Sequence, residues 1–594
     1  MKLDTWPNLV VMLFDQAAKH GDAPFLWEKR DGAYRSISWR EAAEQVGALA
    51  RALKAYGLAK GDRVVLLAEN SPQWAIADFA IMAAGGVSVP AYTTNTARDH
   101  AHILNDCGAT TAIVSTTVLA GPLVEAAKDA KALKRIVAIE PVGGAAPAHV
   151  TVSSWAEALS KGATAPGDPA AEAGDIDAGA LACLIYTSGT GGVPKGVMLS
   201  HRAMFCNCVG AHDLLLELGL GDEVFLSFLP LSHSYEHSCG LMFPVSIGAQ
   251  IYYAEGVETL TTNLAEARPT IMTAVPRLYE VMRQRILAGV KRQKGLKAKL
   301  FWRAVELGRK RYEAPGTLGL GERLLDWLVE RLVRNKVRAR FGGRLKALVS
   351  GGAPLNYDVG VFFTALGLRL LQGYGQTEAA PVVSCNPPSR IKLRTVGPAL
   401  TDVEVKIADD GEILVRGPLL MDGYWNHKDL SEETLRNGWL HTGDIGVIDQ
   451  DGYIQITDRK KDIIVNSGGD NVSPQRVEGI LTLEPEIEQA MVIGDQRPHL
   501  VGLLVPSEEF VRDWARENKS DGDLAGIRGD KAFRAAVSEA VDRANAGLSQ
   551  VEKVKRYVIA EAAFTVDNGM MTPTMKVRRH EILKHYGPEL EALY

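Results

Sequence analysis

The segment Tyr186-Thr-Ser-Gly-Thr190-Gly-Gly-Val-Pro-Lys195-Gly196 decides the fold, because it directly follows Leu181 to Ile185, an apolar run typical of a buried β-strand. It combines hydroxyl donors, glycines that let the backbone approach an anion, and one cation, so it suits a polyphosphate. These groups are Thr187, Ser188, Thr190, Gly189, Gly191, Gly192 and Lys195. It is not a Walker A loop, since Pro194 precedes the lysine and Gly196 follows it. The sequence therefore predicts a strand that ends in a phosphate-binding loop.

Around this segment, short apolar runs that end in polar or glycine-rich turns alternate with longer helical stretches. This pattern is typical of an α/β protein with largely parallel sheets. The clearest expected strands are residues 64–68, 181–186, 271–275, 345–349 and 368–371. Residues 403–456 alternate over short segments between Asp-Gly turns, which predicts a small antiparallel β unit. We expect residues 142–177, which are rich in Ala, Gly and Pro, to form a mobile surface connection.

Length and composition exclude several classes of protein. A chain of 594 residues is too long for one core, and 46% hydrophobic with 23% charged residues is ordinary for a globular protein. The 66 basic and 71 acidic residues argue against a generally basic nucleic-acid binder. Six scattered cysteines suit no disulfide framework, and Cys206 and Cys208 lack a second ligand pair for zinc. Without a signal-peptide pattern or an apolar run of about 20 residues, the sequence favours a cytoplasmic enzyme.

The phosphate-binding segment closely resembles that of the acyl-adenylate-forming superfamily, which includes acyl-CoA synthetases, adenylation domains and luciferase. One departure is Gly191, which stands where the family usually has a second Thr. Gln372-Gly-Tyr-Gly-Gln-Thr377-Glu378, expected just after the strand at 368–371, resembles the family's adenine and metal loop. The side chains suit that role: Tyr374 can stack on a purine, Thr377 can donate to the α-phosphate, and Glu378 can hold Mg²⁺. The resemblance implies ATP and Mg²⁺, with Glu378 and Thr187 as catalytic and metal-binding residues and with Gln372 and Gly373 beside the nucleotide.

Two further segments resemble the rest of a nucleotide site. Ser350-Gly-Gly-Ala-Pro-Leu355 resembles a wall of the adenine pocket, formed here by Gly351, Gly352 and Ala353. His441-Thr-Gly-Asp444 resembles the segment whose Asp binds the ribose hydroxyls, a task that suits a carboxylate. By itself Thr-Gly-Asp is equally a simple turn. Arg459 stands in the place of an arginine that contacts the nucleotide.

The resemblance also implies a division of the chain and a second set of functional residues. It predicts a large adenylation domain at 1–457, a hinge at 458–461 that begins at Asp458 and ends at Lys461, and a small mobile C-terminal α+β domain at 462–594. Ser467, Gly468 and Gly469 resemble the turn that faces coenzyme A. Lys576 stands where the family keeps its catalytic lysine, and a lysine on a mobile domain can neutralise the reacting carboxylate and phosphate and then withdraw. The run of five charged residues at 458–462 is equally explained by a solvated linker, which we favour for Lys460.

The acyl site has a weaker signal. Pro230-Leu-Ser-His233-Ser-Tyr-Glu-His237 resembles the segment in which a histidine lies beside the acyl carboxylate, and this implies a catalytic role for His233. Some family members have an aromatic gate four residues later. Here His237 holds that position, which argues against a tryptophan gate.

Residues 281–341 form a basic insertion typical of long-chain synthetases. The stretch from 283 to 344 holds 18 basic and 5 acidic residues, which leaves the rest of the chain acidic. Leu324, Leu325, Leu328, Val329 and Leu332 are expected on one side of a helix, and the arginines at 323, 331, 334 and 338 on one arc. Two interpretations stay open: residues 283–340 contact an anionic membrane on its inner face, or the apolar stripe packs on the large domain and the arginines are only solvated.

The predicted function is an ATP-dependent acid:CoA ligase that forms an acyl-adenylate and then a thioester, with a long-chain fatty acid and coenzyme A as substrates. Two alternatives remain: an adenylating enzyme that loads a separate carrier protein, or a silent lipid-binding scaffold. Lys576, Glu378 and Arg459 argue against the scaffold. The sequence predicts neither the acyl chain length nor the oligomeric state.

Overall fold

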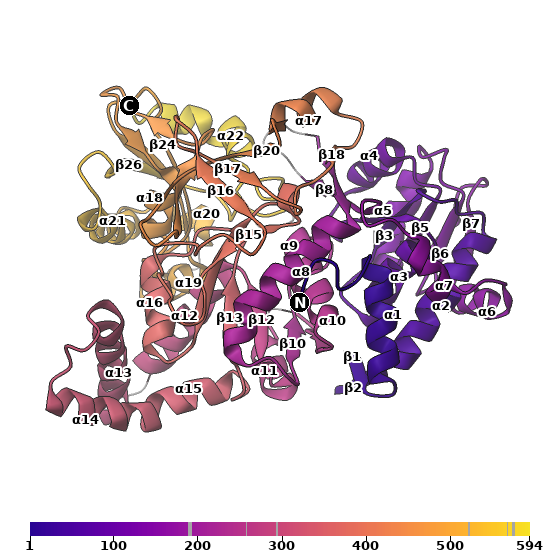
Figure 1. The fold of residues 1–594 in the computed structure, drawn as a ribbon. Helices are drawn as coiled ribbons and strands as arrows, with labels where there is room; N and C mark the ends of the chain where they lie inside the picture. Colours follow the sequence, from indigo (N-terminus) through magenta and orange to yellow (C-terminus); the bar gives the residue numbers. More distant parts are fainter. Residues whose placement is uncertain are drawn as a thin grey trace.

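The computed structural model describes residues 1–187, 193–256, 258–292, 295–518, 520, 523–566, 568–572 and 577–594. Two eight-stranded sheets build the larger part of the chain, and both are parallel except at their edges (Figure 1). The first sheet has the order β18-β9-β8-β4-β3-β5-β6-β7 and the second the order β15-β14-β13-β12-β10-β11-β1-β2. The α/β prediction is therefore confirmed.

The first sheet holds both ends of the predicted phosphate segment, because β8 ends at Thr187 and β9 begins at Lys195. Its strands are β3 (Arg63–Leu67), β4 (Val87–Pro90), β5 (Thr111–Val114), β6 (Arg135–Ala138), β7 (Thr151–Ser154), β8 (Leu181–Thr187), β9 (Lys195–Ser200) and β18 (Gly423–Tyr424). Its helices include α2 (Trp39–Ala55), α3 (Pro72–Ala83), α4 (Ala97–Cys107), α5 (Thr117–Ala127) and α6 (Trp155–Thr164). The stretch 142–177, predicted to be a mobile surface connection, contains regular structure: β7 adds to the sheet edge in parallel with β6, and α6 packs on α2.

The second sheet carries the remaining predicted motifs. Its strands are β1 (Pro24–Arg30), β2 (Ala33–Ser38), β10 (Val224–Ser227), β11 (Gln250–Tyr253), β12 (Ile271–Ala274), β13 (Ala347–Ser350), β14 (Leu370–Gly375) and β15 (Val382–Cys385). Helices α1 (Leu9–His20) and α8 (His201–Leu215) belong to the largest apolar core, which joins residues of both sheets and of α3. The predicted end of the strand at Leu371 is wrong. Hydrogen bonds to β13 and β15 extend β14 to Gly375, so Gln372 and Tyr374 lie in the strand and not in a loop after it.

The antiparallel β unit predicted at 403–456 is confirmed. It consists of β16 (Glu404–Ile407), β17 (Glu412–Arg416), β19 (Leu435–Arg436), β20 (Trp439–Ile448) and β21 (Ile454–Arg459). Beyond it, β24 (Ile487–Ile493), β25 (Leu500–Pro506) and β26 (Val554–Ile559) form a small sheet. Helices α18 (Pro474–Leu481) and α21 (Lys531–Ala546) share one apolar core with this sheet, and α22 (Arg579–Glu591) shares another. This part is the expected small α+β unit.

The basic insertion projects from the second sheet as α12 (Pro276–Lys291), α13 (Leu296–Glu313), α14 (Leu320–Val329) and α15 (Asn335–Arg340) (Figure 1). The predicted arc of four solvated arginines is wrong for Arg334, whose side chain is fully buried. A π-helical turn at Glu330–Arg334 separates α14 from α15. It changes the 3.6-residue phase on which the arc was based. Among the described residues, no helix is long and apolar enough to cross a bilayer.

Candidate active site

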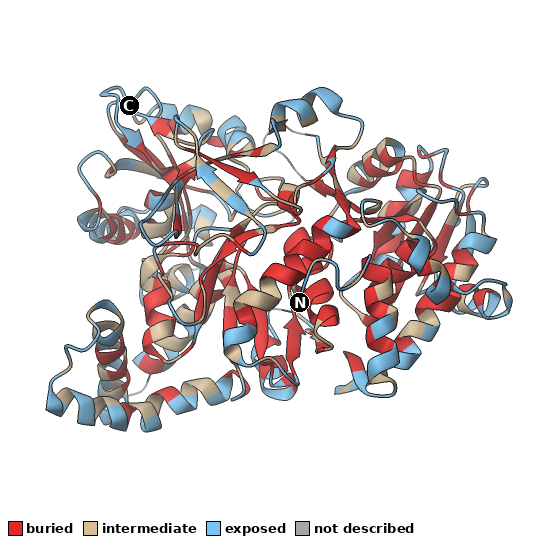
Figure 2. Cartoon of the chain, viewed as in Figure 1, coloured by how far each residue is buried: buried red, intermediate tan, exposed pale blue. Residues whose placement is uncertain are grey.

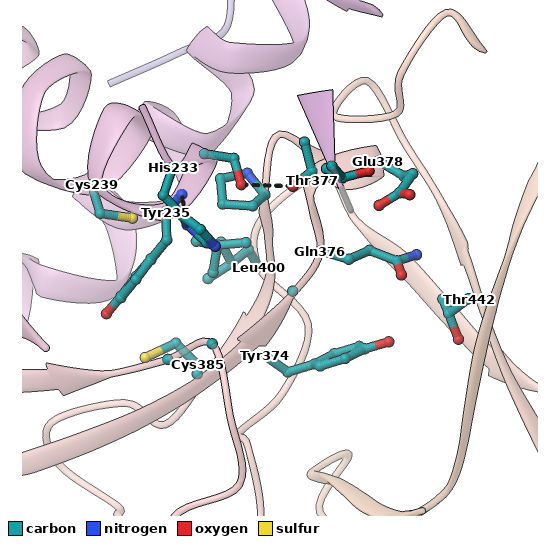
Figure 3. A pocket seen from close by; sticks show the side chains of 18 of the residues that line it. His233, Tyr235, Cys239, Tyr374, Gln376, Thr377, Glu378, Cys385, Leu400 and Thr442 are labelled. Carbon is teal, nitrogen blue, oxygen red and sulfur yellow. Dashed lines mark hydrogen bonds between the residues drawn. The ribbon is translucent and has the colours of Figure 1, made fainter. Parts of the chain in front are cut away.

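A cavity of about 650 Å³ lies where the carboxyl ends of β8, β13 and β14 face the β unit (Figure 3). Ligands of open α/β sheets bind at this edge. The cavity brings together many of the predicted site residues, namely Thr187, Lys195, His233, Gly351, Gly352, Gly373, Tyr374, Thr377, Glu378, Arg459 and Lys461.

Other predicted residues are not on the cavity wall or are not described. Ala353, Gln372, Asp444 and Asp458 are not among the lining residues, although Asp444 bonds to two that are. Ser467, Gly468 and Gly469 form an exposed turn that contributes nothing to the lining. Ser188, Gly189, Thr190, Gly191, Gly192 and Lys576 lie outside the described residues.

Tyr374 and Arg459 hold the Asp444 carboxylate from two sides. The Tyr374 Oη donates to Asp444 Oδ2 at 2.6 Å, and the Arg459 Nε donates to Oδ1 at 2.9 Å. Asp444 and Arg459 are direct partners between β20 and β21, which brings the predicted hinge to this carboxylate. Burial, reinforced by Asp444, raises the pKa of Tyr374, so its hydroxyl remains a donor. The predicted adenine and ribose residues therefore form one hydrogen-bonded unit with Arg459.

Thr377 and Glu378 follow β14 in a short helical turn, and both line the cavity (Figure 3). The Thr377 hydroxyl shares a hydrogen bond of 3.0 Å with the Ser234 hydroxyl, so the nucleotide motif touches the His233 segment. The Glu378 carboxylate accepts a hydrogen bond from Tyr424 Oη at 2.8 Å. Burial, with the Glu378 carboxylate nearby, raises the pKa of Tyr424.

The histidine segment has one residue in the cavity and one in the core. His233 lines the cavity, and its Nδ1 accepts from the Tyr235 backbone N–H at 3.1 Å at the start of α9 (Ser234–Glu236). His237 is fully buried, with Nε2 at 2.8 Å from Asp78 Oδ2 and Nδ1 at 3.8 Å from Cys183 Sγ. The residue at the gate position is thus fixed in the core.

The two ends of the phosphate segment are attached to α4, which sequence analysis did not identify. Tyr186 Oη donates to the Asp106 carboxylate, and His102 Nε2 lies 2.9 Å from the Pro194 carbonyl oxygen. Asp106 and Tyr424 stand far from their partners in sequence and belong to no motif. Their role follows only from the three-dimensional contacts.

The inner part of the cavity is apolar. Its walls include Ala211, Leu214 and Leu215 of α8, Phe225 of β10, Ile271 of β12, Phe243 at the start of α10 (Phe243–Ser246), and Leu400. Two free thiols, Cys239 and Cys385, also line it. Burial raises the pKa of Cys239 well above its ordinary value and that of Cys385 to about 12. This branch can hold an apolar chain whose polar end reaches His233 and Thr377.

The described part of the chain contains no cluster of three or more His, Cys, Asp or Glu side chains that could hold a metal ion by itself. The Glu378 carboxylate and the Thr187 hydroxyl both line the cavity. Mg²⁺ typically binds through one or two carboxylates plus the phosphates of its substrate. These residues therefore fit a Mg²⁺ ion that arrives with a nucleotide.

The chain combines two parallel-rich α/β sheets, a β unit and a small C-terminal unit with one cavity that holds both the predicted nucleotide residues and apolar side chains. This combination of fold and site defines an adenylate-forming enzyme.

Comparison with known families gives the same result. The model of the AMP-binding enzyme family matches residues 13–425, and the model of the AMP-binding enzyme C-terminal domain matches residues 461–594. The chain belongs to the AMP-binding enzyme family.

Its relatives include the long-chain-fatty-acid–CoA ligase FadD15 of Mycobacterium tuberculosis, which is 34% identical over 99% of this chain and 97% of the relative. The peroxisomal long chain acyl-CoA synthetase 6 of Arabidopsis thaliana is 29% identical over 95% of this chain and 82% of the relative. Among solved structures, the adenylation domain of a carboxylate reductase from Mycobacterium chelonae has a TM-score of 0.77 at 23% identity. The match covers 100% of this chain and 92% of that one. At this identity the structural likeness shows the fold alone.

Proposed function

We propose that the protein is an ATP-dependent ligase that joins long-chain fatty acids to coenzyme A, with an acyl-adenylate as intermediate. The observation that carries the proposal is the continuity of the cavity. Its apolar branch and its nucleotide residues meet at the hydrogen bond between Ser234 and Thr377. The names of the relatives support the same reaction and the long acyl chain.

In the first half-reaction, a carboxylate oxygen of the fatty acid attacks the α-phosphorus of ATP, and the bond to the β-phosphate breaks to release pyrophosphate. Tyr374 would stack on the adenine, Asp444 would accept hydrogen bonds from the ribose, and Thr377 would donate to the α-phosphate. Mg²⁺, held by Glu378 and Thr187, would neutralise phosphate charge. The apolar branch excludes water, which protects the adenylate from hydrolysis.

In the second half-reaction, the coenzyme A thiolate attacks the acyl carbon and AMP leaves. We assign the large domain to 1–457, the hinge to 458–461 and the small domain to 462–594. In this structure the small domain touches the large one through Arg277 Nη2 to Glu488 Oε1 at 2.9 Å and Asn356 Nδ2 to the Gly479 carbonyl at 3.2 Å. A rotation about the hinge would break these two contacts and bring the exposed turn at 467–469 to the cavity.

The decisive assay is ATP–pyrophosphate exchange with short, aryl and fatty acids, followed by coenzyme A addition. We expect exchange with long-chain acids and thioester formation. If no acid supports exchange, the adenylation function is wrong and the silent scaffold is favoured. If exchange occurs but no thioester forms, the acceptor is a separate carrier protein.

The role of Lys576 can be tested by separating the two half-reactions. Lys576→Ala should slow adenylate formation by several orders of magnitude and leave thioester formation from supplied acyl-adenylate close to normal, because the lysine is needed only while the phosphate reacts. Equal losses in both steps would contradict a lysine that withdraws with the small domain.

We also propose that α14 binds an anionic bilayer peripherally, at the cytoplasmic face. Leu320, Leu324, Trp327 and Leu328 recur at helical spacing, and their exposed fractions are 85%, 69%, 52% and 38% (Figure 2). Of the stripe predicted from the sequence, Val329 is fully buried with Ala304 and Leu307 of α13, and Leu325 is partly buried against them.

The charges around this exposed stripe favour an anionic partner. The acids of α14 and the π-helical turn are paired within the insertion, Glu322 with Lys310 and Asp326 with Arg311. Arg323 is exposed beside the stripe, and the Arg331 guanidinium lies 4.1 Å from the centre of the Trp327 ring. Exposed apolar side chains flanked by cations suit the interface of an anionic bilayer.

Vesicle co-sedimentation tests this second proposal. The protein should bind vesicles of phosphatidylglycerol and phosphatidylcholine, and the double variant Leu324→Ser with Leu328→Ser should bind less. Leu216→Ser is the matched control, since Leu216 is 51% exposed outside the insertion. Equal binding by the double variant and the parent would refute the role of α14.

A further inference from the structure

Tyr424 belongs to a segment that contacts two parts of the predicted nucleotide site, namely β9 and Glu378. It lies in β18, which pairs with β9 so that Tyr424 faces Val197 and Gly423 faces Met198. Strand β9 begins at Lys195, the cation of the phosphate segment. On the other side, the Met421 backbone N–H donates to the Glu378 carbonyl at 2.9 Å. The backbone around Tyr424 is therefore fixed relative to both the phosphate segment and Glu378.

The Tyr424 side chain makes the corresponding contacts inside the cavity. Its Oη donates to Glu378 Oε1 at 2.8 Å, and the Lys195 Nζ lies 5.7 Å from the centre of its ring. All three residues line the cavity. Tyr424 thus lies between the carboxylate and the cation that are both expected to meet the phosphates.

We propose that Tyr424 is a positioning residue for the divalent cation that accompanies the nucleotide. The proposal rests on the proposed role of Glu378 as its ligand. A glutamate side chain must be ordered before it can bind a metal, and ordering it costs rotamer entropy. A hydrogen bond to one carboxylate oxygen orders the side chain in advance and leaves the second oxygen for the cation. This is the usual function of groups that support a metal ligand.

Tyr424→Phe tests the proposal because it removes the hydroxyl and keeps the ring beside Lys195. Mn²⁺ serves as the probe, and its affinity is measured by electron paramagnetic resonance on the full-length protein with α,β-methylene-ATP. We expect the Kd for Mn²⁺ to rise about 10-fold, the effect of losing one hydrogen bond to a charged group. The Kd of the variant for the same nucleotide, measured in EDTA, should differ from that of the parent by less than about twofold.

Two further variants make the outcome specific. Tyr453→Phe is the matched control, since it removes a hydroxyl that donates to the Arg390 carbonyl at 2.8 Å and does not line the cavity. It should leave the Mn²⁺ affinity unchanged. In a Glu378→Gln background, which weakens the metal site by itself, Tyr424→Phe should add little further loss, because both changes act through the same carboxylate.

The possible results separate this inference from the proposed function. If the parent protein fails to bind the nucleotide or to exchange pyrophosphate, the proposed function is wrong. If the parent is active and Tyr424→Phe leaves the Mn²⁺ affinity unchanged, or weakens metal-free nucleotide binding by the same factor, Tyr424 has no role in placing the cation. Additive losses in the double variant would also overturn the proposal.

Discussion

Replacing Ala211 with phenylalanine should shorten the acyl chains that the enzyme accepts. Ala211 lies on α8 and lines the apolar branch of the cavity with Leu215 and Ile271. Ile271 stands three residues before Ala274, and Ala274 is the partner of Ser350 at the nucleotide end. The branch therefore extends about 10 Å along β12.

The fall in kcat/KM depends on how many methylene groups of the acyl chain the phenylalanine ring excludes from the cavity. Burial of one CH₂ group contributes about 0.8 kcal/mol. If the ring excludes about four methylenes, the kcat/KM for a long acid should fall by about 200-fold, whereas a chain that ends before Ala211 should be affected less than about threefold. The expected signature is thus a change of preference rather than a general loss.

The assay is ATP–pyrophosphate exchange with octanoate, laurate, palmitate and oleate, for the parent and for Ala211→Phe. Leu214→Ala, on the same wall, provides the opposite perturbation and should favour longer chains. Thermal unfolding shows whether each variant is folded. If folded Ala211→Phe keeps the parent ratio of palmitate to octanoate activity, the apolar branch does not hold the acyl chain.

Three other predictions concern Arg334, Glu236 and His102. Arg334→Met should lower the free energy of unfolding by about 3 kcal/mol in a denaturant titration, because the buried guanidinium donates to the Ala365 and Ala304 carbonyls. Arg323 is exposed, so the control Arg323→Met should lower it by less than about 0.5 kcal/mol. Burial raises the pKa of Glu236 from 4.5 to about 7, so the native state keeps this proton when the unfolded state has released it, and the parent loses stability as the pH rises from about 4.5 to about 7. Glu236→Gln removes this pH-dependent loss. In urea unfolding, the stability of the variant relative to the parent should therefore increase by on the order of 3 kcal/mol across that pH window and then stay constant. A stability difference that does not depend on pH would contradict the reasoning. His102→Phe removes the contact with the Pro194 carbonyl oxygen, so it should raise the KM for ATP about 10-fold in pyrophosphate exchange and leave the KM for the acid unchanged. His102→Gln retains a hydrogen-bond donor and should raise the KM for ATP less. Equal effects of the two variants would argue against the contact with the phosphate segment.

The sequence predicts the parts of this protein that depend on local pattern. The apolar run before Thr187 predicts β8, and the glycines and hydroxyl residues that follow it predict the phosphate segment. Both signals lie within a few residues of each other. Tyr374 and Asp444 each follow from a short motif, but their hydrogen bond joins positions 70 residues apart and has no local signal. The contact of Tyr424 with Glu378 was missed for the same reason.

The incorrect predictions have specific physical causes. The glycines and polar residues at 372–375 favour a loop, but neighbours on both sides supply the hydrogen bonds that make them part of β14. A helical projection at constant pitch places Arg334 on the surface, whereas the π-helical turn rotates it into the core.

The raised pKa values of Cys239 and Cys385 affect how readily these two thiols could react with an activated acyl group. An acyl-adenylate is a strong acylating agent, and in the proposed reaction it forms in a cavity with two protein thiols in its wall. Only a thiolate is an effective nucleophile, and burial keeps both of these thiols protonated near neutral pH. In the proposed reaction, these protonated thiols would be poor nucleophiles toward the acyl-adenylate, which would disfavour acylation of the cavity wall.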